Sequence, residues 1–62
     1  MGILRNIFVR RQVEVGEEIN VGTPDGVKRG VIKRDLSKDK RYNQVRNGEN
    51  VNRGWYEVEV ES

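Results

Sequence analysis

Lysine and arginine are the side chains whose number and spacing in this sequence point most clearly to chemistry. Residues 26–46 carry a local charge of +6, whereas residues 12–25 and 47–62 carry −4 and −3. Basic side chains on one surface bind the phosphate backbone of nucleic acid, and aromatic side chains beside them stack on bases. The candidate nucleic-acid-binding residues are Lys28, Arg29, Lys33, Arg34, Lys40, Arg41, Tyr42, Arg46 and Trp55.

A second interpretation of the same charges remains open. Basic residues on a solvated strand often pair with neighbouring glutamates and bind nothing. Lys33 and Arg34 are adjacent, and neighbours on a strand point to opposite faces, so only part of the basic set can share one surface. Trp55 also has two interpretations: an exposed recognition anchor, or a cover for one open end of a small barrel.

Enzymatic chemistry is not expected. The chain has no histidine and no cysteine, which excludes thiolate chemistry and the usual zinc sites. The glutamates of residues 57–61 alternate along a solvated strand face, and Gly22 to Gly26 lacks the Lys-Ser/Thr pair of a phosphate-binding loop. We therefore predict a non-enzymatic protein with no cofactor and no metal.

Length and composition predict one small all-β domain over residues 1–62. Ten of the 21 apolar residues are valine and none is alanine, a composition that favours strands. A chain of 62 residues buries a small core, which favours oligomerisation or a partner as added support. No apolar run approaches the roughly 20 residues of a membrane span. The lack of cysteine is typical of an intracellular, cytoplasmic protein.

Alternating valines organise the expected fold. The pattern predicts a five-stranded antiparallel meander, curled into an SH3-like small barrel, with strands near 6–15, 18–23, 27–34, 41–46 and 50–61. We expect connections at Gly16 to Glu18, a Pro-Asp-Gly turn after Thr23 that pairs Thr23 with Val27, and a loop at Asn47-Gly48 that pairs Val45 with Val51. Gly30 indicates a bulge or a close backbone approach. The predicted core is Ile7, Val13, Val15, Ile19, Val21, Val27, Val31, Val45, Val51, Tyr56, Val58 and Val60.

Residues 2–11 fit two structures. Ile3, Leu4, Ile7 and Phe8 lie on one side of a helix, but the same run also fits a strand, and periodicity cannot separate the two over so short a length. A short basic amphipathic helix at the N-terminus therefore stays an alternative to a strand.

Residues 19–32 resemble the hairpin of SH3-like barrels that carry a KOW motif. The likeness consists of the strand Ile19-Asn20-Val21, the loop Gly22 to Gly26 and the step Gly30-Val31-Ile32. Many members of that family bind RNA or ribosomal partners, so the resemblance implies a small barrel with a binding role.

The sequence supports two hypotheses about function. The first is a nucleic-acid-binding module that uses the basic centre with Tyr42 and Trp55. The alternative is a protein-interaction or assembly module, such as a small accessory or virus-encoded subunit. Such a module could self-associate as a homo-oligomer, with a basic strand of one copy meeting the Glu57-Glu59-Glu61 edge of another.

Overall fold

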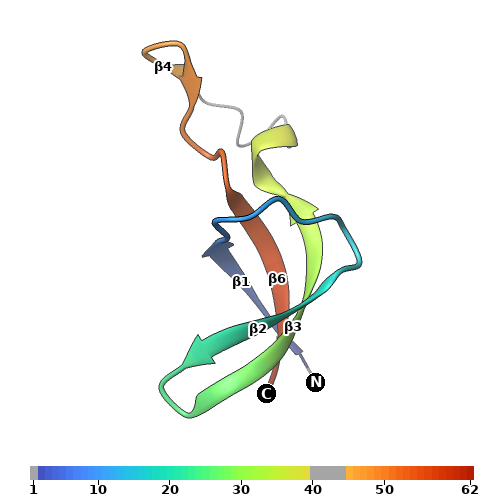
Figure 1. Ribbon diagram of the computed structural model, residues 1–62. Coiled ribbons are helices and arrows are strands. Elements are labelled where there is room, and N and C mark those ends of the chain that lie inside the picture. The colour runs from blue at the N-terminus through green and yellow to red at the C-terminus, as the bar shows by residue number, and fades with distance from the viewer. Residues whose placement is uncertain (1, 40–44) are drawn as a thin grey trace.

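The strands form two antiparallel sheets in the computed structural model, which describes residues 2–39 and 45–62 (Figure 1). The larger sheet has four strands in the order β1-β6-β3-β2, and a two-stranded ribbon, β4-β5, stands at one end of it. The elements are β1 (Gly2–Phe8), β2 (Glu18–Thr23), β3 (Gly26–Asp35), the 3₁₀ turn η1 (Leu36–Lys38), β4 (Val45–Arg46), β5 (Glu49–Asn50) and β6 (Trp55–Glu61). In these described ranges no helix is long and apolar enough to cross a membrane.

The all-β, antiparallel character is confirmed, but the five-stranded meander and its closure into a barrel are not. The last strand, β6, pairs with β1 on one side and with β3 on the other. Both hydrogen-bonding edges of β6 are therefore occupied. Glu57, Glu59 and Glu61 therefore offer their side chains, and not a backbone edge, to a basic strand of another copy, and that self-association stays a prediction.

The N-terminal segment is a strand, which settles the choice between strand and helix. It covers residues 2–8 and not 6–15, because Val13 to Val15 leave the sheet. The Glu17 N–H donates to the Glu14 carbonyl oxygen at 3.0 Å and closes a turn in which Gly16 has a φ of +94°. This left-handed conformation favours glycine. The Gly16 N–H then donates to the Ile32 carbonyl oxygen at 2.7 Å, which ties the turn to β3.

The β2–β3 hairpin has a shorter loop than the sequence predicted. Thr23 pairs with Gly26, not with Val27, so the loop contains only Pro24 and Asp25. The Thr23 hydroxyl donates to the Gly26 carbonyl oxygen at 2.6 Å and accepts from the Asp25 N–H at 3.2 Å. Because successive side chains alternate between faces, this one-residue change turns the opposite face of β3 toward the core.

The core lies on the concave face of the four-stranded sheet. Ile32 and Val58 are fully buried, and Ile32 takes the place that the sequence assigned to Val31. Val15, Val27, Val45 and Val51 were predicted as core, and that prediction is wrong: they are 65%, 75%, 66% and 41% exposed. Val13, Val21, Tyr56 and Val60 complete the main cluster, with Ile7, Val9 and Ile19 partly buried against it.

The missing side chain of Gly30 allows β3 to pack closely against residues of β6 and β2. A Cβ atom at this position would lie 2.7 Å from Val58 Cγ1 and 3.0 Å from Val21 Cγ2, closer than ordinary van der Waals contact. The predicted close backbone approach at Gly30 is therefore confirmed. Two residues later the pairing of β3 with β6 shifts between Ile32 and Arg34, so Lys33 is an extra residue in the strand.

The C-terminal third forms two elements where a single strand was predicted over 50–61. Asn47 and Gly48 make a two-residue turn with φ of +54° and +80°, and Val45 pairs with Asn50 and not with Val51. The Asn-Gly turn is confirmed, and its loop is again shorter than expected. The predicted strand 41–46 lies mostly outside the described residues, which include only Val45 and Arg46 of it.

Candidate nucleic-acid interface

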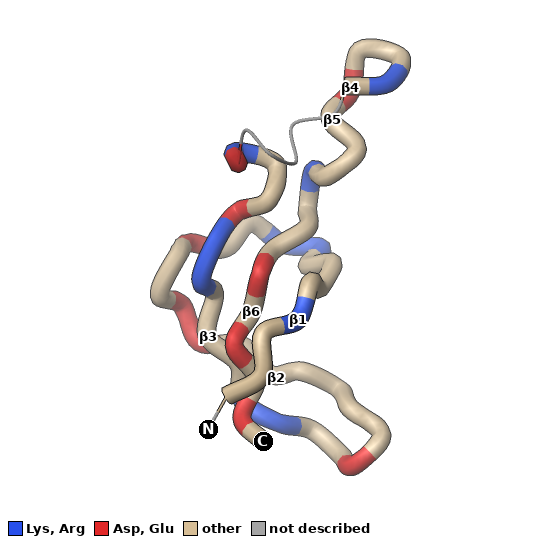
Figure 2. Tube along the Cα trace, turned by 180° about the vertical axis from the view of Figure 1, so that it is seen from behind, with Lys and Arg blue, Asp and Glu red and all other residues tan. Residues whose placement is uncertain are grey.

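Basic residues of β3 lie beside acidic residues of β6 in the sheet (Figure 2). Their side chains form ion pairs on the outer face, opposite the core. Lys33 Nζ lies 3.2 Å from Glu59 Oε1, and the Arg34 guanidinium lies 2.7 Å from Asp39 and 3.4 Å from Glu57. Across the other edge of β3, Arg29 Nε lies 3.5 Å from Glu18 Oε2. The outer face thus carries neighbouring opposite charges, which cancel much of its field at a distance.

Two other predicted site residues that the structure describes, Lys28 and Arg46, do not lie on that face. Lys28 pairs with Val21 in the hairpin and is partly buried on the concave side. Lys40, Arg41 and Tyr42 lie outside the described residues. Arg46 stands on the β4–β5 ribbon, remote in sequence from β3. The described part of the basic stretch is therefore divided among separate surfaces.

Trp55 projects from the outer face, as its alternation with Tyr56 predicts. It is 37% exposed and lies opposite Phe8 in the β1–β6 register. The two ring centroids are 5.6 Å apart with an interplanar angle of 63°, an edge-to-face contact. Phe8 is 51% exposed, so the pair presents aromatic surface to solvent.

Gly54 allows this aromatic pair to form. Its φ is +86°, and a Cβ atom there would lie 2.8 Å from Phe8 Cε1. The ring of Phe8 thus rests against bare backbone. The Val9 N–H donates to the Gly54 carbonyl oxygen at 2.8 Å and fixes the end of β1 beside the start of β6.

A hollow of about 540 Å³ opens between the end of β1 and the β4–β5 ribbon. Phe8 forms part of its wall, together with three arginines and one glutamate: Arg10, Arg46, Arg53 and Glu49. Within residues 2–39 and 45–62 these arginines form no ion pair. Guanidinium groups that are not neutralised, next to an exposed ring, can contact phosphate and stack on a base.

One side-chain and two backbone hydrogen bonds hold the wall of this hollow in place. The Asn50 side-chain amide donates to the Ser37 carbonyl oxygen at 2.9 Å, which links the ribbon to η1. The Asn50 carbonyl accepts from the Arg53 N–H at 3.1 Å, and the Asn52 carbonyl accepts from the Trp55 N–H at 2.9 Å. The four residues 51–54 therefore form a tight turn that delivers the chain into β6.

One carboxyl group has a shifted pKa. The Arg11 guanidinium hydrogen-bonds Glu17 at 2.5 Å and, with a further bond from the Glu14 N–H, lowers the pKa of the Glu17 carboxyl. The pair lies in the loop after β1 and stabilises that loop. In the part of the chain that the structure describes, no group of three or more acidic side chains is placed to hold a metal ion.

Sequence reasoning found Trp55 and Arg46 but missed Phe8, Arg10 and Arg53. These three residues reach the hollow only because β1 pairs with β6, a contact between the two ends of the chain. The available signal was the paired occurrence of an aromatic and an arginine at each end, Phe8 with Arg10 and Trp55 with Arg53. Comparisons of the chain with models of protein families, with curated proteins and with solved structures found no match.

Proposed function

We propose that this chain is a non-enzymatic module that binds single-stranded nucleic acid at the hollow beside Phe8. One observation carries the proposal: three arginines that form no ion pair in the described residues line a hollow together with the exposed ring of Phe8, which contacts Trp55. Base stacking on aromatic rings stabilises single-strand complexes by about 1–3 kcal/mol per base. We also propose that residues 19–32 resemble the hairpin of KOW-type, SH3-like barrels, many of which bind RNA, and this resemblance supports a nucleic-acid-binding role.

The placement of charge favours the hollow over the outer face of β3. Phosphate groups that approach Arg29, Lys33 or Arg34 meet glutamate side chains at the same time. At the hollow the phosphates meet three basic side chains, those of Arg10, Arg46 and Arg53, and one acidic side chain. We therefore expect contact with the hollow first, and with the face of β3 only where its ion pairs open.

Two double variants of equal charge separate these surfaces. Arg46→Gln with Arg53→Gln removes two charges from the hollow, and Arg29→Gln with Lys33→Gln removes two from the outer face. For a labelled single-stranded oligonucleotide, the slope of log affinity against log salt should fall by about 1.4 in the first variant only, at about 0.7 per lost phosphate contact. Fluorescence anisotropy across salt concentrations gives both slopes, and Trp55 quenching in the wild type reports contact at the aromatic pair.

Strand type is tested in the same titration with single-stranded RNA, single-stranded DNA and duplex. Aromatic stacking requires unpaired bases, so the duplex should bind most weakly at equal charge. Absence of binding at low salt, or a loss confined to the Arg29 and Lys33 variant, would overturn the proposal.

A protein-interaction or assembly module is the second candidate. A specific observation favours it: β1 and β2 are the edge strands of the main sheet, and among residues 2–39 and 45–62 each pairs with another strand on one side alone. Unpaired edges can join a second copy or a foreign strand. Light scattering across protein concentration tests self-association, since a homo-oligomer gains mass with concentration and a monomeric binder does not.

A further inference from the structure

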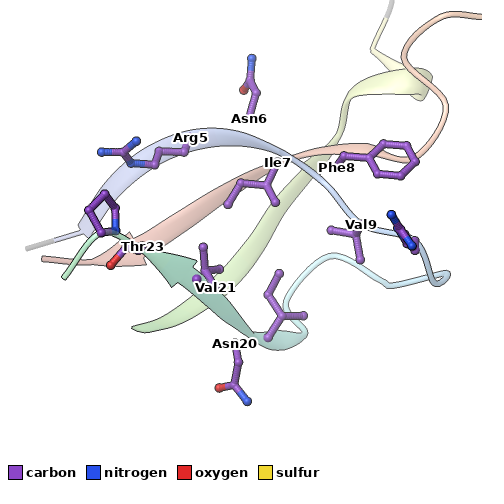
Figure 3. A pocket seen from close by; sticks show the side chains of 12 residues that line it. Arg5, Asn6, Ile7, Phe8, Val9, Asn20, Val21 and Thr23 are labelled. Carbon is purple, nitrogen blue, oxygen red and sulfur yellow. The ribbon is translucent and has the colours of Figure 1, made fainter. Parts of the chain in front are cut away.

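A cleft of about 650 Å³ separates the two edge strands of the main sheet (Figure 3). The sheet is curled, so that β1 and β2 face each other across its concave side. Ile7 points into the cleft from β1 and Val21 from β2, whereas Asn6 and Asn20 point away from it. Ile7, Val9 and Ile19 are only partly buried, so the cleft exposes apolar side chains that the core does not cover.

Backbone groups border the cleft on both sides. Strand β1 is hydrogen-bonded to β6 alone and β2 to β3 alone, and no strand pairing joins β1 to β2 among the described residues. Alternate N–H and C=O groups of each edge strand therefore face the cleft. Since adjacent strands in this sheet are antiparallel, β1 and β2 run in opposite directions. One added strand would run antiparallel to one edge and parallel to the other.

The charge of the cleft has one sign. Its charged lining residues are Arg5 and Arg10, near opposite ends of the β1 wall, and no acidic residue lines it. In the described ranges neither arginine forms an ion pair. An occupant that carries carboxylates therefore finds two cations that are not neutralised, whereas a basic occupant would be repelled.

Strand β6 shows what kind of strand this sheet accepts. Its sequence alternates, so that Val58 and Val60 cover the concave face while Glu57 and Glu59 meet Arg34 and Lys33 on the outside. The cleft repeats this chemistry in part: apolar side chains and Arg5 lie on its concave face, and Arg10 follows the end of β1. An extended acidic segment with β-branched residues at alternate positions fits both features.

We propose that the cleft binds an extended acidic peptide as a fifth strand of the sheet, paired with the open edge of β1. Valine or isoleucine side chains of the peptide cover Ile7, Ile19 and Val21. Its carboxylates are attracted by Arg5, which lies on the same face of β1 as Ile7, and by Arg10, which follows the end of β1. This inference deepens the second candidate function and names its partner by chemistry. The cleft shares Phe8 and Arg10 with the hollow, but Arg46 and Arg53 line the hollow and not the cleft, so variants at Arg46 and Arg53 separate nucleic-acid binding from peptide binding.

The test uses the full chain and a capped seven-residue peptide that alternates glutamate and valine. Its control peptide has lysine in place of each glutamate. We expect the acidic peptide to shift the amide NMR signals of residues 5–9 and 19–23 and to slow hydrogen exchange along β1, while the lysine peptide does neither. A third peptide with N-methylated valines should not bind, because it cannot donate to the β1 edge.

Charge-reversal variants locate the contact. Arg5→Glu should weaken acidic-peptide binding at least tenfold and permit binding of the lysine peptide, whereas Lys38→Glu, an equal charge change on η1, should do neither. Arg5→Gln serves as the milder variant if the reversed one fails to fold. Equal binding of the two peptides would overturn the proposal, and so would NMR shifts confined to the Phe8–Trp55 end. A dimer in light scattering that the acidic peptide does not dissociate would also overturn it, because a second copy would then occupy the cleft. Loss of oligonucleotide binding alone would leave it standing.

Discussion

Gly30→Ala tests the packing of β3 against β6 most directly. The added methyl group would lie 2.7 Å from Val58 Cγ1, and Val58 is fully buried, so its short branched side chain has no free space to rotate into. Overpacking of this kind costs about 1–3 kcal/mol. The smaller conformational freedom of alanine in the unfolded chain offsets about 0.4–1 kcal/mol. We expect a net loss of about 1–2 kcal/mol.

Such a loss is large for this protein. A chain of 62 residues has a total stability of about 3–9 kcal/mol, and each kcal/mol changes Tm by about 4–8 °C. Thermal and urea denaturation followed by circular dichroism should therefore show a Tm lower by about 4–16 °C. Gly22→Ala is the matched control, because Gly22 lies in the neighbouring strand and a Cβ atom added there would meet no atom within 4 Å. It should leave Tm unchanged or raise it slightly.

A double variant checks the cause. Val58→Ala removes the methyl group that the new Cβ would approach. In that background, Gly30→Ala should cost less by about 1 kcal/mol, the coupling expected for residues in contact. Equal Tm values for Gly30→Ala and Gly22→Ala in the wild-type background would refute the register in which Gly30 faces the core.

Three further outcomes are expected. Ile32→Ala should cost about 2–5 kcal/mol of unfolding free energy and Val31→Ala no more than about 1 kcal/mol, and the reverse order in urea denaturation would support the longer hairpin loop. Trp55→Ala should cost well below the roughly 3–5 kcal/mol of a fully buried aromatic, because its ring is partly exposed and its pairing contributes about 0.5–1.5 kcal/mol; chemical denaturation measures this. Arg11→Gln should raise the Glu17 pKa toward its ordinary value in an NMR titration. Since the folded-state pKa is lowered, the small stabilisation by this pair is present at neutral pH and is lost as pH falls through that pKa, and in the variant this acid dependence should shrink.

The elements that sequence predicted correctly are those whose pattern is uninterrupted. Tyr56, Val58 and Val60 alternate with glutamates without a break, and all three are buried. The positions of the turns at Pro24-Asp25 and Asn47-Gly48 were also correct, because proline, asparagine and glycine restrict the backbone locally. Local chemistry therefore placed the turns and one face of the last strand.

Loop length and strand order depended on contacts that local patterns do not contain. The residues around Pro24 are compatible with a loop of two or three residues, and the choice depends on whether Gly30 or Val31 faces Val58. Pairing of β1 with β6 joins segments about 50 residues apart, whereas the meander assumed that successive strands are neighbours. The same distant pairing assembles Phe8 with Trp55, so the candidate site could not be located before the sheet order was known.

The pairing of Gly2 with Glu61 affects the order in which the strands fold and the positions at which the chain can be circularly permuted. Strand β1 has no partner until residues 55–61 exist, so the main sheet closes late, and folding should be slow for a chain of this size because its decisive contacts are non-local. The same feature brings the two ends of the described chain together. A short linker between them, with new ends opened in the exposed Pro24-Asp25 turn, would make β1 and β6 a local hairpin. Such a circular permutant should keep the sheet and fold faster than the original chain.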